Sequence, residues 1–429
     1  MTVQERRGWI IVGSLSIVLL LIAGSGANTF GVFLPTLLKA FPHWSRARVA
    51  LLPSALFFAW GVSVIPVGWL LDRVEARIMI IVGAFAAAGA FLIVSQSNSL
   101  GPMLAAYSLL GLGISAGTLA PASFVTANWF EARRGLAMGI TMAGTTAGGM
   151  AMTLVANYII SGSGWRAAYV ALGLPMIVVV VPLAALVVRS RPPRALGAAQ
   201  LRARESAMRE RKVEMTVAQG ADLLEGFEAL EALRTRSFWM LVIAHLCFGL
   251  VAVGTVVHMI AYLQGLGYKA GSSALAMSIL FGMAGLGKVA MGHVADRISA
   301  RRALMVAFAA GALALLLVFG AANVSLLAVF ILASGIVAGA PVALLPLLVA
   351  ESLGRRRFGV LAALTGIAAM IGATTGPVIA GRIFDVTGGY AGAFELFILA
   401  DVVGALATFA CQSYAQSAGI RAAPAPASA

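Results

Sequence analysis

The chain has 429 residues, of which 61% are hydrophobic and 11% are charged, and its mean hydropathy is +0.97. A soluble domain carries about 25% charged residues, so this composition excludes a water-facing globular surface and predicts a protein that is solvated by lipid. The formal net charge of +14 would suit a nucleic-acid-binding protein if the cations formed one patch. They fall instead in short clusters between apolar segments, so we expect no nucleic-acid partner.

Apolar segments that are long enough to cross a bilayer recur along the whole chain. A helical span takes about 20 residues, and on this basis the sequence predicts an all-α, polytopic membrane protein with twelve transmembrane helices. The predicted helices cover residues 9–38, 46–71, 77–97, 101–129, 133–160, 165–188, 237–265, 270–295, 301–321, 325–350, 356–384 and 390–412.

The distribution of Lys and Arg between these helices predicts their orientation. Even-numbered connections carry arginine pairs and triplets, whereas odd-numbered connections carry few cations, with Arg46 and Arg48 as the main exception. The positive-inside rule then places both termini and the central loop in the cytoplasm. We expect an integral protein of the bacterial cytoplasmic (inner) membrane, divided into a first six-helix bundle, a cytoplasmic central loop, a second six-helix bundle and a cytoplasmic tail, at residues 1–189, 190–236, 237–412 and 413–429.

A charged turn occurs twice with the same spacing of Gly, Asp, Arg and Arg. GWLLDRVEAR begins at Gly68 in the first half of the chain, and GHVADRISAR begins at Gly292 in the second half. In each copy the carboxylate can cap the positive N-terminus of a helix in the other half of the molecule. The simpler interpretation is that the cations only fix the cytoplasmic side. The gating candidates are Gly68, Asp72, Arg73, Arg77, Gly292, Asp296, Arg297 and Arg301.

The repeat continues outside the charged turns. Gly148 corresponds to Gly372, and Gly164 corresponds to Gly388, with the same offset in residue number that separates Gly68 from Gly292. A constant offset across separate segments indicates two pseudo-symmetric six-helix bundles, related by an axis along the membrane normal. The substrate site of such a protein is expected near the midplane, between the two bundles.

The doubled Gly-x-x-x-Asp-Arg-x-x-x-Arg turn, the twelve helices and the long central loop resemble the major facilitator superfamily. Gly8-Trp9 and the segment NWFEARRGLAMG, from Asn128, resemble the monocarboxylate transporters, and HMIAYLQGLG, from His258, resembles bacterial members of that family and oxalate–formate exchangers. The resemblance implies a secondary transporter of small organic anions that works by alternating access, with the charged turns as latches of the outward-open state.

Lys288 is the leading candidate for the anion site. It lies eight residues before Asp296, about 12 Å along the helix, and therefore near the middle of a hydrocarbon core about 30 Å thick. An ionised group at this depth costs at least about 2.5–3.5 kcal/mol and normally faces a partner or a wet cavity. The family that the chain resembles carries an arginine there, which receives the substrate carboxylate. The alternative is a lysine that pairs with a neighbouring helix or snorkels to the interface.

Four further residues could contribute to the site. His258 and Tyr262 lie one helical turn apart and could form its outer part, and Asn28 lies in a glycine-rich stretch that suits a ligand or close helix packing. Lys288 could take up a proton together with the anion. Asp401 is a second proton-coupling candidate because it is an acid at membrane depth, although the twelfth helix is peripheral in the family's fold.

The function that we predict is proton symport of small organic anions, with monocarboxylates as the expected class. The alternatives are carboxylate/carboxylate exchange, efflux of drugs or lipophilic cations, and a membrane sensor that does not transport its ligand. The sequence has no P-loop, nucleotide fingerprint or metal-ligand cluster, so we expect no enzymatic activity, cofactor or metal. The expected partners are the anion, protons and the lipid bilayer, and the expected functional unit is a monomer.

Overall fold

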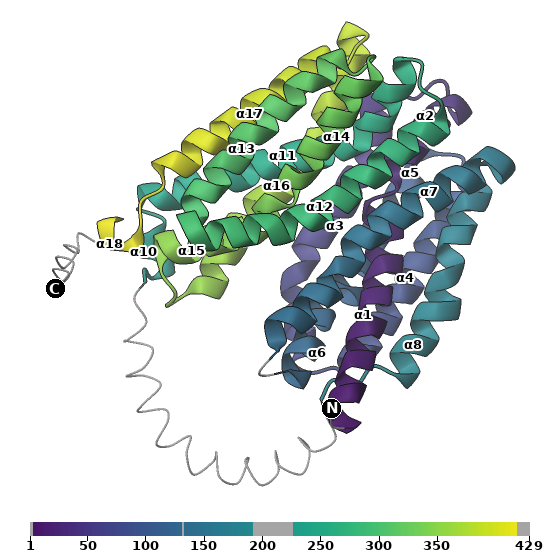
Figure 1. The fold of residues 1–429 in the computed structure, drawn as a ribbon. Coiled ribbons are helices and arrows are strands. Elements are labelled where there is room, and N and C mark those ends of the chain that lie inside the picture. Colours follow the sequence, from purple (N-terminus) through teal and green to yellow (C-terminus); the bar gives the residue numbers. More distant parts are fainter. Residues whose placement is uncertain (1–2, 131–132, 192–225, 418–429) are drawn as a thin grey trace, which may run out of the picture.

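The computed structural model describes residues 3–130, 133–191 and 226–417 (Figure 1). Most of the predicted central loop and the end of the predicted tail therefore lie outside the described residues. The helices form two groups. The first group comprises α1 (Val3–Ala27), α2 (Phe30–Ala40), α3 (Arg46–Leu71), α4 (Ala76–Gln96), α5 (Leu100–Gly117), α6 (Leu119–Trp129), α7 (Arg134–Pro175), a π-helical segment (Met176–Val180) and α8 (Val181–Leu186).

The second group follows after residue 225. It comprises α10 (Ala229–Ala232), α11 (Arg236–Gly265), α12 (Ala270–Ile298), α13 (Ala300–Leu316), a 3-10 segment (Leu317–Gly320), α14 (Val324–Ala338), α15 (Ala340–Leu353), α16 (Phe358–Thr387), α17 (Ala391–Ala410) and α18 (Tyr414–Ser417).

The described residues contain eleven helical stretches that are long and apolar enough to cross a membrane. One of them, Gly135–Leu186, has 52 residues and consists of two helices that meet at Gly164, where φ is 83°. Glycine adopts this left-handed conformation without the steric cost that a Cβ atom brings. The described residues thus contain twelve membrane-crossing segments, which confirms the predicted all-α fold.

The predicted repeat is visible in the backbone and in the packing. Gly388, the counterpart of Gly164, also has a positive φ, of 75°, where α16 ends. Gly148 lets α7 approach α1, because a Cβ atom there would lie 2.8 Å from the Cα atom of Gly24. Its counterpart Gly372 lets α16 approach α11 in the same way, since a Cβ atom there would lie 2.7 Å from the nitrogen of Leu250. Small residues at these crossings allow close helix contact within a membrane.

Two hydrogen bonds between the groups obey the same symmetry. The Ser54 hydroxyl on α3 donates to the Thr374 carbonyl on α16 at 2.5 Å. The Ser278 hydroxyl on α12 donates to the Met150 carbonyl on α7 at 2.7 Å. The offset of the repeat relates the two donors to each other and the two acceptors to each other, so a single two-fold operation relates the two bonds. The symmetry axis therefore runs between the α3–α16 and α7–α12 contacts.

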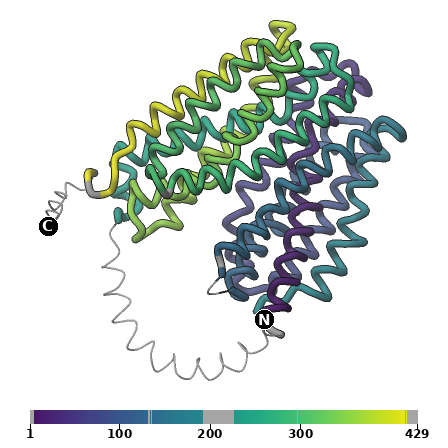
Figure 2. Tube along the Cα trace, viewed as in Figure 1, coloured from purple at the N-terminus to yellow at the C-terminus, as the bar shows by residue number. Residues whose placement is uncertain are grey.

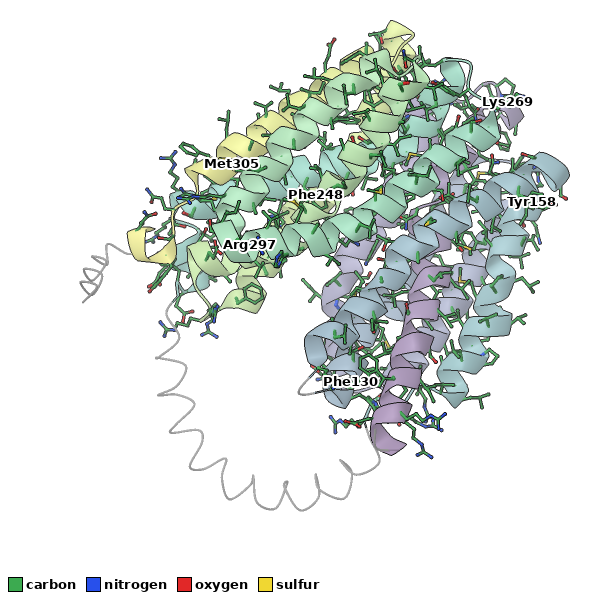
Figure 3. All side chains as sticks on the ribbon, in the orientation of Figure 1. Phe130, Tyr158, Phe248, Lys269, Arg297 and Met305 are labelled. Carbon is green, nitrogen blue, oxygen red and sulfur yellow. The ribbon has the colours of Figure 1, made fainter. Side chains whose placement is uncertain are left out.

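The two ends of the molecule differ in charge. We call the end at which α3, α6, α12 and α15 finish the basic end, and the other end the opposite end. Figure 3 shows Phe130 and Arg297 at the basic end, and Tyr158 and Lys269 at the opposite end. The arginines of the basic end include Arg73, Arg77, Arg297, Arg301, Arg355, Arg356 and Arg357.

The two helix groups lie close together at the opposite end and diverge toward the basic end (Figures 1 and 2). One apolar core joins both groups at the opposite end, where Phe33 of α2 and Ile260 of α11 belong to the same cluster. At the basic end the second group has a separate core around Phe238, Leu348 and Leu361. The contacts that hold the groups together are thus concentrated at the opposite end.

Candidate functional site

Lys288 lies on α12, in the half of the helix that leads to the basic end. Its side chain is half-buried and forms no hydrogen bond or ion pair with any described residue. Its backbone and Cγ atom pack against the α14–α15 junction, because a Cβ atom at Gly339 would lie 2.8 Å from the Lys288 nitrogen and 3.0 Å from Cγ. The ammonium group therefore has no permanent counter-ion among the described residues.

The helical face that carries Lys288 turns toward the first helix group. Phe281 lies seven residues before Lys288, two helical turns away on the same face. A Cβ atom at Gly149 would lie 2.9 Å from the Phe281 ring and 3.0 Å from the Asn28 side-chain nitrogen. On the turn between, Gly285 is next to Thr146 of α7. Lys288 thus follows directly after the last of these contacts, where the two groups begin to separate.

Asn28 is the second candidate that the structure places at this crossing. It lies between α1 and α2, is half-buried, and donates from Nδ2 to the Thr145 carbonyl at 3.3 Å. Its amide oxygen accepts no hydrogen bond from a described residue. Asn28 and Phe281 thus both lie against Gly149 of α7.

Breaks in membrane helices mark the same region. The first transmembrane segment is interrupted at Asn28 and Thr29, the fourth at Thr118 and the tenth at Gly339. Proline follows each of the last two breaks, at Pro121 and at the N-terminal end of α15. Proline removes a backbone donor, and interrupted helices within a membrane are tolerated where they are buried in protein or line a binding cavity. Lys288 contacts one of these breaks, and Asn28 forms another.

Asp401 lies on α17, against α13. Its side chain is buried on α17, and a Cβ atom at Gly311 of α13 would lie 2.7 Å from Oδ2 and 3.6 Å from the Val337 side chain. Asp401 forms no hydrogen bond or ion pair with a described residue. Gly311 is thus next to both Asp401 and Val337, which lies two residues before Gly339, and no described contact joins Asp401 to Lys288.

The structure does not bring His258 and Tyr262 to Lys288. His258 is 1% exposed, and its ring nitrogens contact the Tyr390 hydroxyl at 3.0 Å and the Pro377 carbonyl at 2.8 Å. Tyr262 donates to the Val318 carbonyl at 2.7 Å and packs against the Phe394 ring. Both side chains use their polar atoms within the second helix group, so neither is free to bind a substrate in this conformation.

The first charged turn is open to solvent. Asp72 ends α3, is exposed, and forms no hydrogen bond or ion pair with a described residue. Arg73 stacks on the Trp69 ring at 3.7 Å, and Arg77 pairs with Glu75 at 2.5 Å. A Cβ atom at Gly68 would meet nothing within 4 Å. The contacts of this turn thus stay within the first helix group.

The described contacts of the second charged turn also lie within its own group. Arg301 donates to the Cys411 carbonyl at 2.8 Å, and Glu351 accepts a hydrogen bond from the Ala300 nitrogen at 3.3 Å. Gly292 has open space around its Cα atom, and Arg297 is exposed. The side chain of Asp296 lies outside the described part of the structure. The predicted gating roles of both turns remain predictions.

An apolar hollow on the surface, between α13 and α17, offers no alternative anion site. Its lining contains only apolar residues, such as Leu313, Val402 and Leu406. A hydrocarbon-lined groove cannot replace the hydration of a carboxylate. Its chemistry suits an acyl chain of the surrounding bilayer.

Comparison with known proteins identifies the family. Residues 16–288, more than half of the chain, match the family model of the Major Facilitator Superfamily. The chain belongs to the major facilitator superfamily. Within this superfamily, it is 25% identical over 419 residues to monocarboxylate transporter 13 of Rattus norvegicus, an alignment that covers 92% of this chain and 87% of that protein.

Other superfamily members match over shorter stretches. The oxalate:formate antiporter of Oxalobacter formigenes is 26% identical over 242 residues, 56% of this chain and 52% of that protein. The uncharacterized MFS-type transporter YcxA of Bacillus subtilis is 26% identical over 184 residues, 43% of this chain and 45% of that protein. The matched part of the chain thus spans about half the length of these two relatives.

Among solved structures, a bacterial homolog of the human lysosomal transporter Spinster, in an inward-facing and occupied conformation, has the same fold. The TM-score is 0.70 at 18% sequence identity, and the match covers 99% of this chain and 100% of that chain. The same homolog in an unoccupied inward-facing conformation gives a TM-score of 0.69. At this identity the likeness establishes the major facilitator fold and nothing about the substrate.

Proposed function

We propose that this transporter carries a small organic monoanion, with a carboxylate as its charged group, together with a proton. The observation that supports this proposal most directly is the state of Lys288. It is a half-buried cation without a counter-ion among the described residues, beside a helix break and at the point where the two groups diverge. An intramembrane cation requires a partner or a wet cavity, and an anionic substrate supplies that partner.

The number of cations at membrane depth favours a substrate with a single negative charge. The first segment has no Lys or Arg from Gly8 to Leu38, and the eleventh has none from Phe358 to Gly381. These segments contain Asn28, which bonds to Thr145 of α7, and Thr374, which bonds to Ser54 of α3. A dianion would leave one charge unpaired in a site that holds one ammonium group, and an unpaired buried charge is costly.

We propose that the basic end faces the cytoplasm, which makes this conformation inward-facing. The proposal relies on the clusters of arginine at that end and on the positive-inside rule. Alternating access then requires that the groups close at the basic end and separate at the opposite end. The charged turns would engage only in that second state, which agrees with an Asp72 that is exposed and has no partner among the described residues in the present one.

We expect Asp72→Asn to lower the population of the outward-facing state about two- to fivefold. The reason is that a carboxylate at a helix N-terminus contributes about 0.3–1 kcal/mol. Distances between spin labels at Leu186→Cys and Leu230→Cys, which are exposed at the basic end, measure this population. Glu395→Gln, an exposed acid on α17, is the matched control. An unchanged distance distribution in Asp72→Asn would assign the turn to topology alone.

The transport reaction is tested in proteoliposomes that contain the purified protein. We expect an inward proton gradient to drive a labelled monocarboxylate above its equilibrium concentration. If the protein catalysed counterflow of the labelled monocarboxylate but did not accumulate it under the proton gradient, the reaction would be carboxylate exchange and not proton symport. Transport of a lipophilic dye would establish efflux, and saturable binding without flux would establish a sensor.

The proton site is tested separately. Lys288 packs against Gly339 at the α14–α15 junction, and Asp401 lies against Gly311 of α13. We propose that the proton binds at one of these two side chains. Uptake measured at several pH values in Asp401→Asn tests this choice, because an unaltered pH profile leaves Asp401 with a packing role and keeps Lys288 as the candidate for the transported proton.

A further inference from the structure

Arg46 and its partners join the two helix groups at the opposite end, and we call this set the Arg46 clamp. The Asp385 carboxylate at the end of α16 accepts hydrogen bonds from the nitrogens of Arg46 and Ala47 at 2.9 and 3.0 Å. These are free N–H groups in the first turn of α3, so the acid caps a helix of the other group. The Arg46 guanidinium lies 3.7 Å over the Phe384 ring and donates to the Tyr390 hydroxyl at 2.9 Å.

The hydrogen bonds of the clamp continue inward to His258. The Pro377 carbonyl can only accept, so the His258 nitrogen that contacts it, Nε2, carries a hydrogen. Tyr390 accepts from Arg46, which leaves its own O–H to donate to Nδ1 of His258. The network is therefore complete with a neutral imidazole. It leads from the exposed Asp385 through Arg46 and Tyr390 to the His258 side chain, which is 1% exposed.

The clamp does not follow the internal repeat. The positions that correspond to Arg46 and Asp385 are Ala270 and Ser161, which cannot form a charged cap. The serine bonds between the groups are symmetric, whereas the charged helix cap that the described residues form between the groups occurs on the α3–α16 side. The opposite end thus carries one charged contact that repetition of the fold does not require.

We propose that His258 is a proton-binding site that releases the Arg46 clamp. A proton that binds to Nδ1 turns this nitrogen from an acceptor into a donor. Nδ1–H must then donate to the Tyr390 oxygen, which already accepts from Arg46, and the Tyr390 hydrogen loses its acceptor. The Arg46 guanidinium and the His258 imidazolium then both donate to the Tyr390 oxygen. The buried Tyr390 hydroxyl hydrogen is left without an acceptor, which costs about 1–3 kcal/mol. The charged groups that act on His258 are Arg46 and Asp385, and Tyr262 is the neighbouring phenol.

The proposal gives the transport cycle a direction with respect to pH. Acid at the opposite end protonates His258, weakens the clamp and favours separation of the groups at that end. Loss of the proton restores the neutral network and closes it again. A proton would therefore open the gate through which the anion enters. This role of His258 rests on the transport function proposed above. The test of the clamp requires no substrate, so the clamp and the transport function can fail independently.

The experiment measures the opening of the opposite end with spin labels at Ser163→Cys and Val386→Cys. Both positions are exposed there, and the two native cysteines are buried. We expect the ratio of long to short distances to rise at least about threefold from pH 8 to pH 5, within the limit of tenfold per pH unit for one proton. His258→Gln should abolish this response. His245→Gln should retain it, because the hydrogen bond that the ring of this histidine forms with a described residue is to the Leu241 carbonyl of its own helix, at 2.9 Å.

A second variant protects the test against misfolding of His258→Gln. Tyr390→Phe removes the hydroxyl that joins Arg46 to His258. We expect it to populate the long distance at pH 8 and to respond weakly to acid, with an elution profile like that of the parent protein. A pH response of normal size in folded His258→Gln, or a closed and pH-responsive Tyr390→Phe, would overturn the proposal.

Discussion

Replacement of Lys288 by alanine is expected to lower the affinity for the transported anion by about 30-fold to several thousand-fold. This range corresponds to about 2–5 kcal/mol, the usual cost of removing one partner from a buried charged pair. The effect should be large because Lys288 has no counter-ion in the described part of the protein that could rearrange to compensate. Thermal shifts with a panel of carboxylates, followed by uptake of the best ligand, measure it.

Two variants make this experiment specific. Lys288→Arg keeps the charge and is expected to retain part of the binding, since a guanidinium can also receive a carboxylate. Lys269→Ala removes a lysine from the exposed start of the same helix and should leave affinity unchanged. If Lys288→Ala transported the anion with normal affinity, Lys288 would have no part in the mechanism.

The substitution Gly372→Val is expected to lower the free energy of unfolding of the second helix group by about 3 kcal/mol or more. Overpacking usually costs about 1–3 kcal/mol, and here the new atoms would meet backbone, which cannot rotate away. A Cβ atom would lie 2.7 Å from the Leu250 nitrogen and close to the Leu246 carbonyl. The melting temperature in detergent and the monodisperse fraction on size-exclusion chromatography should both fall.

The same substitution elsewhere on α16 provides the control. Gly366 lies six residues earlier, and a Cβ atom there would meet nothing within 4 Å. Gly366→Val should therefore melt near the parent temperature. Gly148→Val should reproduce the defect of Gly372→Val in the first group, since the repeat places Gly24 against that glycine. Equal stability of Gly372→Val and Gly366→Val would contradict the close approach of α11 and α16.

The sequence predicted those features of the fold that depend on composition and on local spacing. Twelve apolar stretches predicted twelve spans because the bilayer sets one length for all of them. The constant offset between the two halves of the chain predicted the two-fold arrangement, and it singled out Gly148 and Gly372, which both lie at close helix crossings. It also paired Gly164 with Gly388, and both have a positive φ.

The partners of individual polar groups could not be predicted in this way. His258 and Tyr262 were proposed as ligands because a histidine and a phenol at membrane depth require an explanation. Their partners, Pro377, Tyr390 and Val318, lie 56 to 132 residues away, and no local pattern identifies such distant contacts. Arg46 is a cation on the side of the membrane where the positive-inside rule expects few, and this exception was the sequence feature that marked the clamp.

The two serine hydrogen bonds between the helix groups make the interface equivalent to that of a symmetric dimer. In an isologous interface between identical subunits, residue i of one subunit contacts residue j of the other, and j contacts i. Ser54 with Thr374 and Ser278 with Met150 form this pattern within a single polypeptide. The interface therefore has the geometry of an isologous dimer of six-helix units within one polypeptide, and the contact between Asp385 and Arg46 departs from that symmetry.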